Sequence, residues 1–418
     1  MSSMQDHVQG SLWGMLIADA LAMPVHWYYT PGTIERDFGP DGIQTYHAPK
    51  HPHPDAFAWS MTYSGNIDIY HGVQKYVQDS KPPPEENPHY HHGLQGGDVT
   101  LQMQWARVLL KCLGKDGSEN HDWAQSFVDF IQTPSPALNN DIYRDVFIRR
   151  YFERLSEGLP LAECPVPQKE CWSVGSMGGV IPGLMTALSF ANSPEISMED
   201  MVARSIEIHR KTHNSENVSE AVTILAPLVV KLCRMPKREQ KSEYSGDPSE
   251  SSLVPEAIDP RRMLILDAAK SFPLPAVTGA SLLRRYNKAR GPGNIPNDEM
   301  YKLHTKRREG VVFDPSLYMD VPDSNVIGRK GFLGTVCYTE HGVPAILYLA
   351  YKYFEDPAKA LKINANLLGD STSRGSLLGC VLGAAHGTEW CQELISGLRQ
   401  KDEFRHDIER FSEEVVSK

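Results

Sequence analysis

The chain has 418 residues, of which 41% are hydrophobic and 22% charged, and its formal net charge is −10. This composition is typical of a globular protein with a sizeable core, and the acidic balance argues against nucleic acid as a partner, because phosphate backbones are bound by basic surfaces. Seven cysteines without CxxC spacing indicate neither a disulfide framework nor a structural zinc site.

The N-terminal region carries no recognisable targeting signal. No apolar run approaches the roughly 20 residues that a membrane span needs, and residues 1–10 lack the basic segment of a secretory signal. We therefore expect a cytoplasmic protein that does not cross a membrane.

The first predicted helix has small residues at every fourth position, namely Gly10, Gly14, Ala18 and Ala22. On a helix with 3.6 residues per turn, this spacing places them in one stripe. The helix should end near Met23, because Pro24 disfavours helical geometry at the residue before it. Asp19 lies inside this apolar helix, where an unpaired charge is costly unless donors or a cation meet it. His26 follows among aromatic residues, and both a packing role and a catalytic role remain open.

The stretch 30–92 shows little periodicity and is rich in Pro, Gly, His, Tyr and Asn. A loop this long in a compact protein is usually functional or disordered. Its aromatic residues favour an ordered cover over a site (Tyr46, Phe57, Trp59, Tyr63 and Tyr70). Its histidines lack cysteines or a helical i, i+4 partner, so we assign them no transition metal. Asp98 then follows Gly97 at the start of another helix.

Most periodic segments have the period of amphipathic helices. They cover 121–132, 140–156, 179–191, 198–212, 216–234, 259–271, 278–289, 340–354, 357–367 and 388–416. The interval 290–330 should be irregular, and the stretch near 235–258 has the composition of a flexible insertion. Strand alternation nowhere exceeds about five residues. We predict an all-α fold with one domain over residues 1–418.

A glycine-rich turn over 172–179, W-S-V-G-S-M-G-G, leads into one of these helices. Its backbone N–H groups are able to cradle an anion, although a tight connection between elements explains the same pattern.

A late helix repeats the small-residue stripe with Gly375, Gly379, Gly383 and Gly387. Each glycine inside a helix costs about 1 kcal/mol relative to alanine, so a second helix pressed against the groove should offset them. The N-terminal helix has the matching stripe, and we expect the two to pack nearly backbone to backbone. Asp370 precedes this helix, where either an N-cap or a catalytic role fits its position.

Several motifs together resemble the ADP-ribosylglycohydrolase family, in the same order over almost the whole chain. They are G-S-L-W-G-M-L-I-A-D-A-L near the start, G-D-V-T-L-Q-M at a helix start, K-T-H between helices, and A-N-L-L-G-D-S-T-S-R-G-S-L-L-G-C-V-L-G-A-A-H-G near the end. The resemblance implies a compact orthogonal bundle of helices. It also implies hydrolysis of the glycosidic bond that joins ADP-ribose to a protein side chain or related acceptor, assisted by magnesium ions.

The metal motifs of that family are only partly present here. By resemblance, Asp98 and Asp370 occupy metal-ligand positions, whereas Val99 and Thr372 stand where the family usually has aspartates. Magnesium is normally held by carboxylates in octahedral geometry, so two missing carboxylates should weaken the site. We therefore keep two alternatives, magnesium as the cofactor and no metal at all.

The resemblance also implies further site residues. Asp19 is kept, and His26 stands where the family often has an acidic residue, so the catalytic candidates are Asp19, His26, Asp98 and Asp370. By resemblance, the ligand-binding candidates are Ser173, Gly175, Ser176, Gly178 and His213. Arg374 is a further candidate from the residue alone, because a guanidinium pairs phosphate bidentately and supplies the positive charge that a metal supplies elsewhere. Arg374 in a surface salt bridge is the rival interpretation.

Two classes of function follow. In the first, the protein hydrolyses a bond to ribose in a small-molecule or ADP-ribosylated substrate, with Asp19, Asp98 and Asp370 lining one cleft as paired carboxylates do in glycoside hydrolysis. In the second, suggested by similarity to the branch of the family that includes the J-crystallins, the same fold serves as a binding or structural protein without turnover. The number of chains that associate is not predicted.

Overall fold

The computed structural model describes residues 3–55, 89–113, 122–133, 141, 143–236 and 258–417. Within these ranges the regular structure is helical, and β pairing is limited to isolated bridges, which confirms the all-α prediction. The α-helices are α1 Ser3–Ala22, α2 Thr33–Phe38, α5 Leu101–Leu113, α6 Trp123–Gln132, α7 Val146–Ser156, α8 Val180–Leu188, α9 Met198–Arg210, α10 Glu216–Arg234, α11 Pro260–Ser271, α12 Gly279–Lys288, α13 Asn297–Thr305, α14 Asp323–Val326, α15 Thr339–Lys352, α16 Pro357–Asn366, α17 Ser371–His386, α18 Gln392–Ser396 and α19 Lys401–Ser417.

Helices α1 and α17 form the centre of the fold. A Cβ added at Gly14 would lie 2.1 Å from the carbonyl oxygen of Gly379, and one added at Gly379 would lie 2.0 Å from that of Gly14. Gly10 and Gly383 meet in the same way one turn further along. No side chain fits between backbones this close, so the predicted contact between the two small-residue stripes is confirmed.

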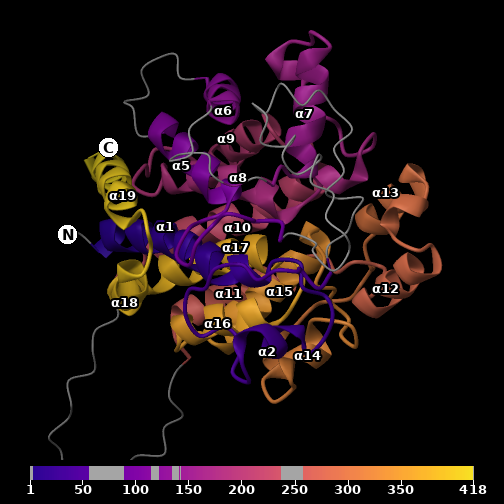
Figure 1. The fold of residues 1–418 in the computed structure, drawn as a ribbon. Coiled ribbons are helices and arrows are strands. Elements are labelled where there is room, and N and C mark those ends of the chain that lie inside the picture. Colours follow the sequence, from indigo (N-terminus) through magenta and orange to yellow (C-terminus); the bar gives the residue numbers. More distant parts are fainter. Residues whose placement is uncertain are drawn as a thin grey trace, which may run out of the picture.

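The remaining helices surround this pair. In Figure 1, α5, α6, α8 and α9 lie on one side of α1 and α17, and α11, α15 and α16 lie on the other. Helices α12 and α13 stand at the edge of the molecule, and α19 packs against α1, which brings the two ends of the chain together. The first and last parts of the sequence therefore share one core, as predicted.

Most predicted helices appear with small shifts at their ends. The interval 290–330 differs from prediction, because it contains α13 and α14. Both are short, and each follows a proline, Pro296 or Pro322, which is the extended residue before the helix. The same prolines give the sequence the composition of a loop, so the helices were not predicted. Of the stretch 30–92, residues 56–88 lie outside the described part of the chain, as do residues 237–257 of the predicted insertion. The aromatic residues Phe57, Trp59, Tyr63 and Tyr70 are among them.

The segment Ser3–Val25 is long and apolar enough to be a membrane span by composition, contrary to the expectation that the chain has none. Its apolar window is entirely buried inside the protein. A core helix enclosed by other helices is apolar on all sides for the same reason.

Candidate functional site

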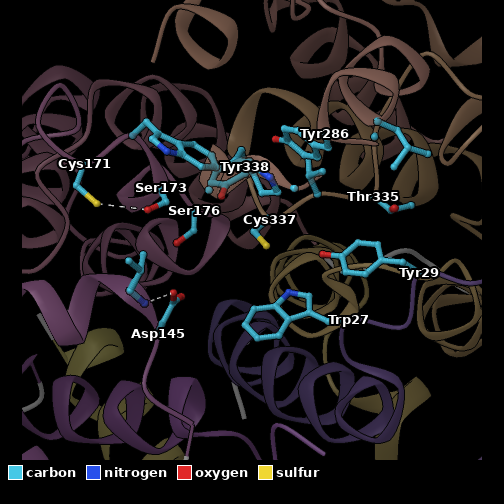
Figure 2. Close-up of a pocket in the computed structure, with 18 of the residues that line it drawn as sticks. Trp27, Tyr29, Asp145, Cys171, Ser173, Ser176, Tyr286, Thr335, Cys337 and Tyr338 are labelled. Atoms are coloured by element: carbon cyan, nitrogen blue, oxygen red, sulfur yellow. Dashed lines mark hydrogen bonds between the residues drawn. The ribbon is translucent and has the colours of Figure 1, made fainter. Parts of the chain in front are cut away.

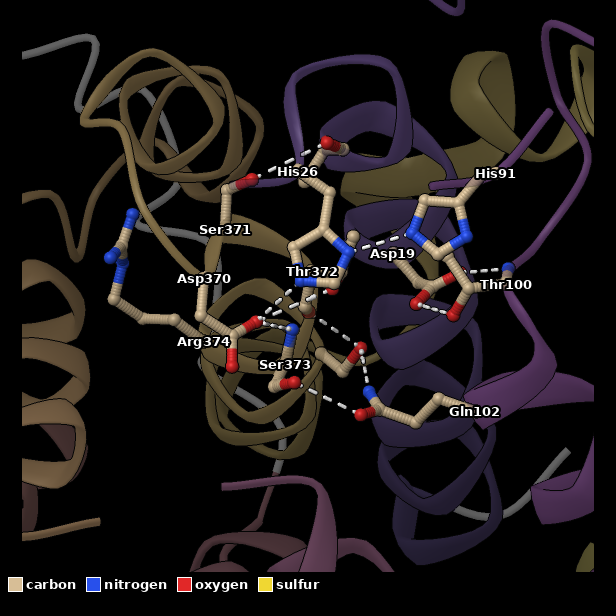
Figure 3. Close-up of polar contacts among 12 residues, drawn as sticks. Asp19, His26, His91, Thr100, Gln102, Asp370, Ser371, Thr372, Ser373 and Arg374 are labelled. Carbon is tan, nitrogen blue, oxygen red and sulfur yellow. Dashed lines mark hydrogen bonds and ion pairs between the residues drawn. The ribbon is translucent and has the colours of Figure 1, made fainter. Parts of the chain in front are cut away.

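Asp370 begins helix α17 and connects it to His26. One oxygen of this buried carboxylate accepts hydrogen bonds from the backbone N–H of Ser373 at 3.2 Å, the hydroxyl of Thr372 at 3.4 Å and Nε2 of His26 at 3.1 Å. Burial alone would raise the pKa of Asp370, but His26 and Ser373 outweigh it, and the pKa lies below its usual value. Asp370 is therefore both the N-cap of α17 and an ionised partner of His26 (Figure 3).

His26 is one member of a chain of four buried side chains. Its Nδ1 lies 2.7 Å from Nε2 of His91, and Nδ1 of His91 lies 2.9 Å from Oδ2 of Asp141. Three hydrogen bonds require three N–H groups, whereas two neutral imidazoles carry two. Burial lowers the pKa of His26 against the raising effect of Asp370, and with both rings neutral the contact between them has no proton to share.

Asp19 and Asp141 both hold the beginning of helix α5. Asp19 accepts hydrogen bonds from the backbone N–H of Thr100 at 2.6 Å and from its hydroxyl at 2.8 Å. Asp141 accepts one from the backbone N–H of Leu101 at 2.8 Å. Burial raises the pKa of Asp19 to about 7, against the lowering effect of Thr100. The hydrogen bonds from Thr100 offset the cost of burying the Asp19 carboxylate within the apolar helix α1.

Asp98 is turned toward the C-terminal part of the chain. Its carboxylate accepts the backbone N–H of Gln95 at 2.8 Å and pairs with Nε of Arg399 at 3.3 Å. Gly97 has a φ of +87° and lies against the carbonyl of Gly397, so the turn before α5 is held on this side. Asp98 and Asp370 therefore have different partners in different surroundings.

These residues do not form a set that fits magnesium. Among the described residues, no group of three or more His, Cys, Asp and Glu side chains is arranged to hold a metal ion. Val99 and Thr372 offer no carboxylates, the same oxygen of Asp370 already accepts three donors, and Asp98 is paired with Arg399. Octahedral ligation by several carboxylates is not available from this arrangement. We therefore derive no chemical step through a metal.

A large cavity of about 1470 Å³ opens beside this region. Its aromatic wall consists of Trp27, Tyr29, Tyr143, Trp172, Tyr286 and Tyr338. Arginines also line it, at positions 149, 150, 154, 290 and 329. In Figure 2, Asp145 and Trp27 lie on one side of the cavity and Tyr286 and Tyr338 on the other. Asp19, His26, Asp98 and Asp370 are not among its lining residues.

Asp145 is one of five carboxylates that line the cavity, the others being Asp55, Glu153, Glu157 and Glu170. It is the N-cap of α7 and accepts the backbone N–H of Val146 at 2.5 Å. Burial raises the pKa of Asp145 to about 6, and the negative charge of Asp370 contributes in the same direction. The thiol of Cys337 also lines the cavity, and burial together with the charges of Asp370 and Asp145 raises its pKa. Asp370 thus acts electrostatically on two groups of the cavity wall.

Three non-glycine residues that line the cavity have backbone conformations that side chains rarely adopt, and one of them is Arg290, with a φ of 57°. Trp27 has a φ of 61° and Leu368 a φ of 66°, and both line the cavity. They are held by an isolated antiparallel bridge, in which Trp27 N donates to Gly369 O at 2.8 Å and Gly369 N donates to Tyr28 O at 2.6 Å. Such strain persists where surrounding structure enforces it, and it is concentrated at functional sites. The bridge also connects His26 and Asp370 to the cavity wall.

The glycine-rich turn contributes Trp172 and its two serines to the cavity, but none of its glycines. Ser173 and Ser176 line it, and the hydroxyl of Ser176 is buried without a hydrogen-bond partner in the described structure. A Cβ at Gly175 would lie 2.5 Å from Nε2 of Gln168, and one at Gly178 would lie 2.7 Å from Oε1 of Gln102. These two glycines therefore allow close packing behind the turn, while the serines face the space in front of it.

His213 and Arg374 lie behind the cavity. His213 is fully buried and packs against Phe147, with ring centroids 3.8 Å apart and ring planes tilted by 34°. Burial holds its pKa well below its usual value. Arg374 donates to Oδ1 of Asn364 at 2.7 Å and to the carbonyl of Leu368 at 3.0 Å. Burial lowers the pKa of Arg374 to about 10. Figure 3 shows its side chain pointing away from His26 and His91, and it is neither a surface residue nor part of the cavity lining.

Sequence reasoning missed Asp145, Cys337 and Tyr286. The cap position of Asp145 carries a readable signal, since an aspartate directly precedes the amphipathic run V-F-I-R-R-Y. The predicted helix began at 140 and so placed this aspartate inside the helix. No local pattern indicates that Cys337 or Tyr286 lies at a cavity, because their neighbours come from distant parts of the chain.

The comparisons with known proteins agree with this architecture. A family model described as ADP-ribosylglycohydrolase matches residues 1–418. Among solved structures, an "ADP-ribosylglycohydrolase-related protein complex" is similar to the chain with a TM-score of 0.51 and 15% identity, over 100% of this chain and 99% of that one. No curated protein gives a significant match. At this identity, the likeness to the solved structure concerns the fold alone.

Proposed function

This chain belongs to the ADP-ribosylglycohydrolase family, and from that premise we propose that it is a hydrolase that cleaves the glycosidic bond between ADP-ribose and an acceptor in the cavity beside Asp145. The observation that carries the proposal is the position of Asp145 in the wall of a cavity lined by arginines and aromatic side chains, with Asp370 close enough to act on it electrostatically. Asp145 has a pKa raised to about 6, whereas the pKa of Asp370 is lowered. Such a separation assigns an acid and an anion to the same reaction.

In this proposal, Asp145 is the general acid. Its proton passes to the acceptor atom as the bond from that atom to the anomeric carbon breaks, and water supplies the oxygen that replaces it. Asp370 does not touch the cavity, and its role is electrostatic. Its negative charge favours the positive charge that develops on the ribose ring, because charges in a site with little water act over a longer range.

The cavity also offers partners for the rest of ADP-ribose. Aromatic side chains supply flat surfaces on which a nucleobase stacks. Arg150 and Arg154 are paired with Glu153 and Glu170, whereas Arg290 and Arg329 make no ion pair within the described structure. Two guanidinium groups of this kind suit a diphosphate. A volume of about 1470 Å³ is sufficient for a nucleotide sugar with its acceptor.

The proposal is tested by incubating the protein with ADP-ribosylated peptides and with ADP-ribose esters, and measuring the free ADP-ribose released. We expect release by the wild type and by Asp98→Asn, whose carboxylate faces Arg399, and loss of release by Asp145→Asn. If no substrate of either class is hydrolysed while ADP-ribose binds in calorimetry, the protein is a binding protein and the proposed hydrolysis is wrong.

A further inference from the structure

A second chain of buried polar groups ends at the opposite wall of the cavity. The hydroxyl of Tyr286 lies 3.1 Å from Nε2 of His304, and Nδ1 of His304 is hydrogen-bonded to Oε1 of Glu340. Tyr286 lines the cavity, whereas His304 is 1% exposed and Glu340 is fully buried. Figure 2 shows Tyr286 on the side of the cavity opposite Asp145.

The middle of this chain is held from several directions. The ring of His304 stacks on Trp172, with centroids 4.8 Å apart and planes 11° from parallel, and it lies 4.3 Å from the ring of Tyr338. Both aromatic residues line the cavity. The other carboxylate oxygen of Glu340 accepts Nδ2 of Asn217 at 3.2 Å. The imidazole is therefore fixed in position and orientation.

The hydrogen bonds fit one arrangement of protons that suits catalysis. Burial would raise the pKa of Glu340, but the charge and hydrogen bond of His304 outweigh it, and the pKa is lowered. With Glu340 ionised and His304 neutral, Nδ1 carries the ring N–H and Nε2 keeps a lone pair. Nε2 then accepts the proton of the phenol, and the oxygen of Tyr286 keeps its lone pairs for a donor in the cavity. Carboxylate, imidazole and hydroxyl are thus arranged in the order of a nucleophile-activating triad.

We propose that Tyr286 is a further catalytic residue of the hydrolase, which takes a proton from the attacking water and passes its own proton to His304, while Glu340 positions that imidazole. This inference rests on the proposed function and identifies the group that deprotonates the attacking water, which the proposed function leaves unassigned. A role confined to packing does not explain why the Tyr286 hydroxyl stands at the cavity in front of a hydrogen-bonded imidazole and carboxylate.

The step balances in protons and bonds. Oxygen of the water bonds to the anomeric carbon, and the bond from that carbon to the acceptor breaks. One water proton moves to the oxygen of Tyr286 as the phenolic proton moves to Nε2 of His304, and the acceptor receives the proton of Asp145. The imidazolium that forms is paired with Glu340, and exchange with solvent returns one proton from His304 to Asp145.

Tyr286→Phe is the direct test, because it removes the oxygen and keeps the ring. Steady-state release of ADP-ribose from an ADP-ribosylated peptide should show kcat lowered by about 10²–10⁴-fold with KM unchanged. Glu340→Gln should lower kcat in the same way, since a neutral amide does not stabilise the imidazolium. Tyr301→Phe, on α13 but outside the cavity lining, is the matched control and should keep the activity of the wild type.

The outcomes separate the two proposals. If the wild type releases ADP-ribose and Tyr286→Phe retains kcat within about tenfold, the proposed base is wrong while the proposed hydrolase stands. A rise in KM at constant kcat would make Tyr286 a binding residue only and would also overturn the inference. If the wild type releases nothing, the proposed function fails and the catalytic role of Tyr286 fails with it.

Discussion

Nε2 of His26 lies 3.1 Å from the carboxylate of Asp370, although 344 positions separate the two residues in the sequence. The contact exists because α1 and α17 meet through glycines, which brings the end of one helix to the beginning of the other. A ring nitrogen thus occupies a place beside Asp370 where the family resemblance predicts a metal ion.

Magnesium should consequently bind weakly or not at all. We expect calorimetric titration of the protein with magnesium chloride to show no saturable heat, and any release of ADP-ribose to persist in a chelator, because Asp370 and Asp98 are already paired with His26 and Arg399. Saturable magnesium binding that disappears in Asp370→Asn would contradict this prediction.

The glycine contact should be intolerant of a single methyl group. Gly379→Ala places a Cβ 2.0 Å from the carbonyl oxygen of Gly14, so the helices must separate. We expect a loss of about 3 kcal/mol in the free energy of unfolding, measured by chemical denaturation. Gly293→Ala is the control, since a Cβ there meets nothing within 4 Å. Equal stability of the two variants would show that α1 and α17 are not in such close contact.

Asp145 should make stability depend on pH. Its pKa is raised from 3.8 to about 6 in the folded state, so the fold favours the protonated form. The stabilisation is complete below the unfolded pKa and is lost as pH rises through about 6. Asp145→Asn keeps an oxygen for the N–H of Val146 and cannot ionise. Its Tm should therefore rise relative to the wild type as pH increases across this range, and a constant difference in Tm would be evidence against the raised pKa.

Arg374 should act mainly through stability. Arg374→Met leaves Oδ1 of Asn364 and the carbonyl of Leu368 without their donor, and we expect a loss of about 3 kcal/mol in the free energy of unfolding. Exposed Arg290→Met should change stability little. The opposite result, unchanged stability together with weaker ADP-ribose binding in calorimetry, would favour the ligand-binding role that the sequence suggested.

The contact between α1 and α17 was predictable because it depends on the local spacing of small residues. Glycines four residues apart lie on one face of a helix whatever surrounds them. Two helices that each carry such a face are expected to pack closely against each other. The cap position of Asp370 is likewise local, since it precedes the helix that it caps. Asp98 also follows a glycine turn at the start of a helix, but it does not join Asp370. Its ion-pair partner is Arg399, which is remote in sequence.

The remainder of the site depends on contacts that local patterns do not encode. His91 appears in the sequence as one of several clustered histidines, and its partners His26 and Asp141 come from other segments. Tyr286 and Glu340 are connected through His304. His304 lies in the interval 290–330, whose composition predicted an irregular structure. The raised pKa of Asp145 arises from burial, which requires the complete fold.

The most direct measurement of the central claim is the rate of ADP-ribose release from an ADP-ribosylated peptide as a function of pH, for the wild type and Asp145→Asn. We predict that the wild-type rate falls as pH rises through about 6, where Asp145 loses its proton, and that the variant is slower by about 10²–10⁴-fold at acidic pH. Equal rates for the two proteins, or no release by the wild type at any pH, would contradict the assignment of this cavity as a hydrolase site.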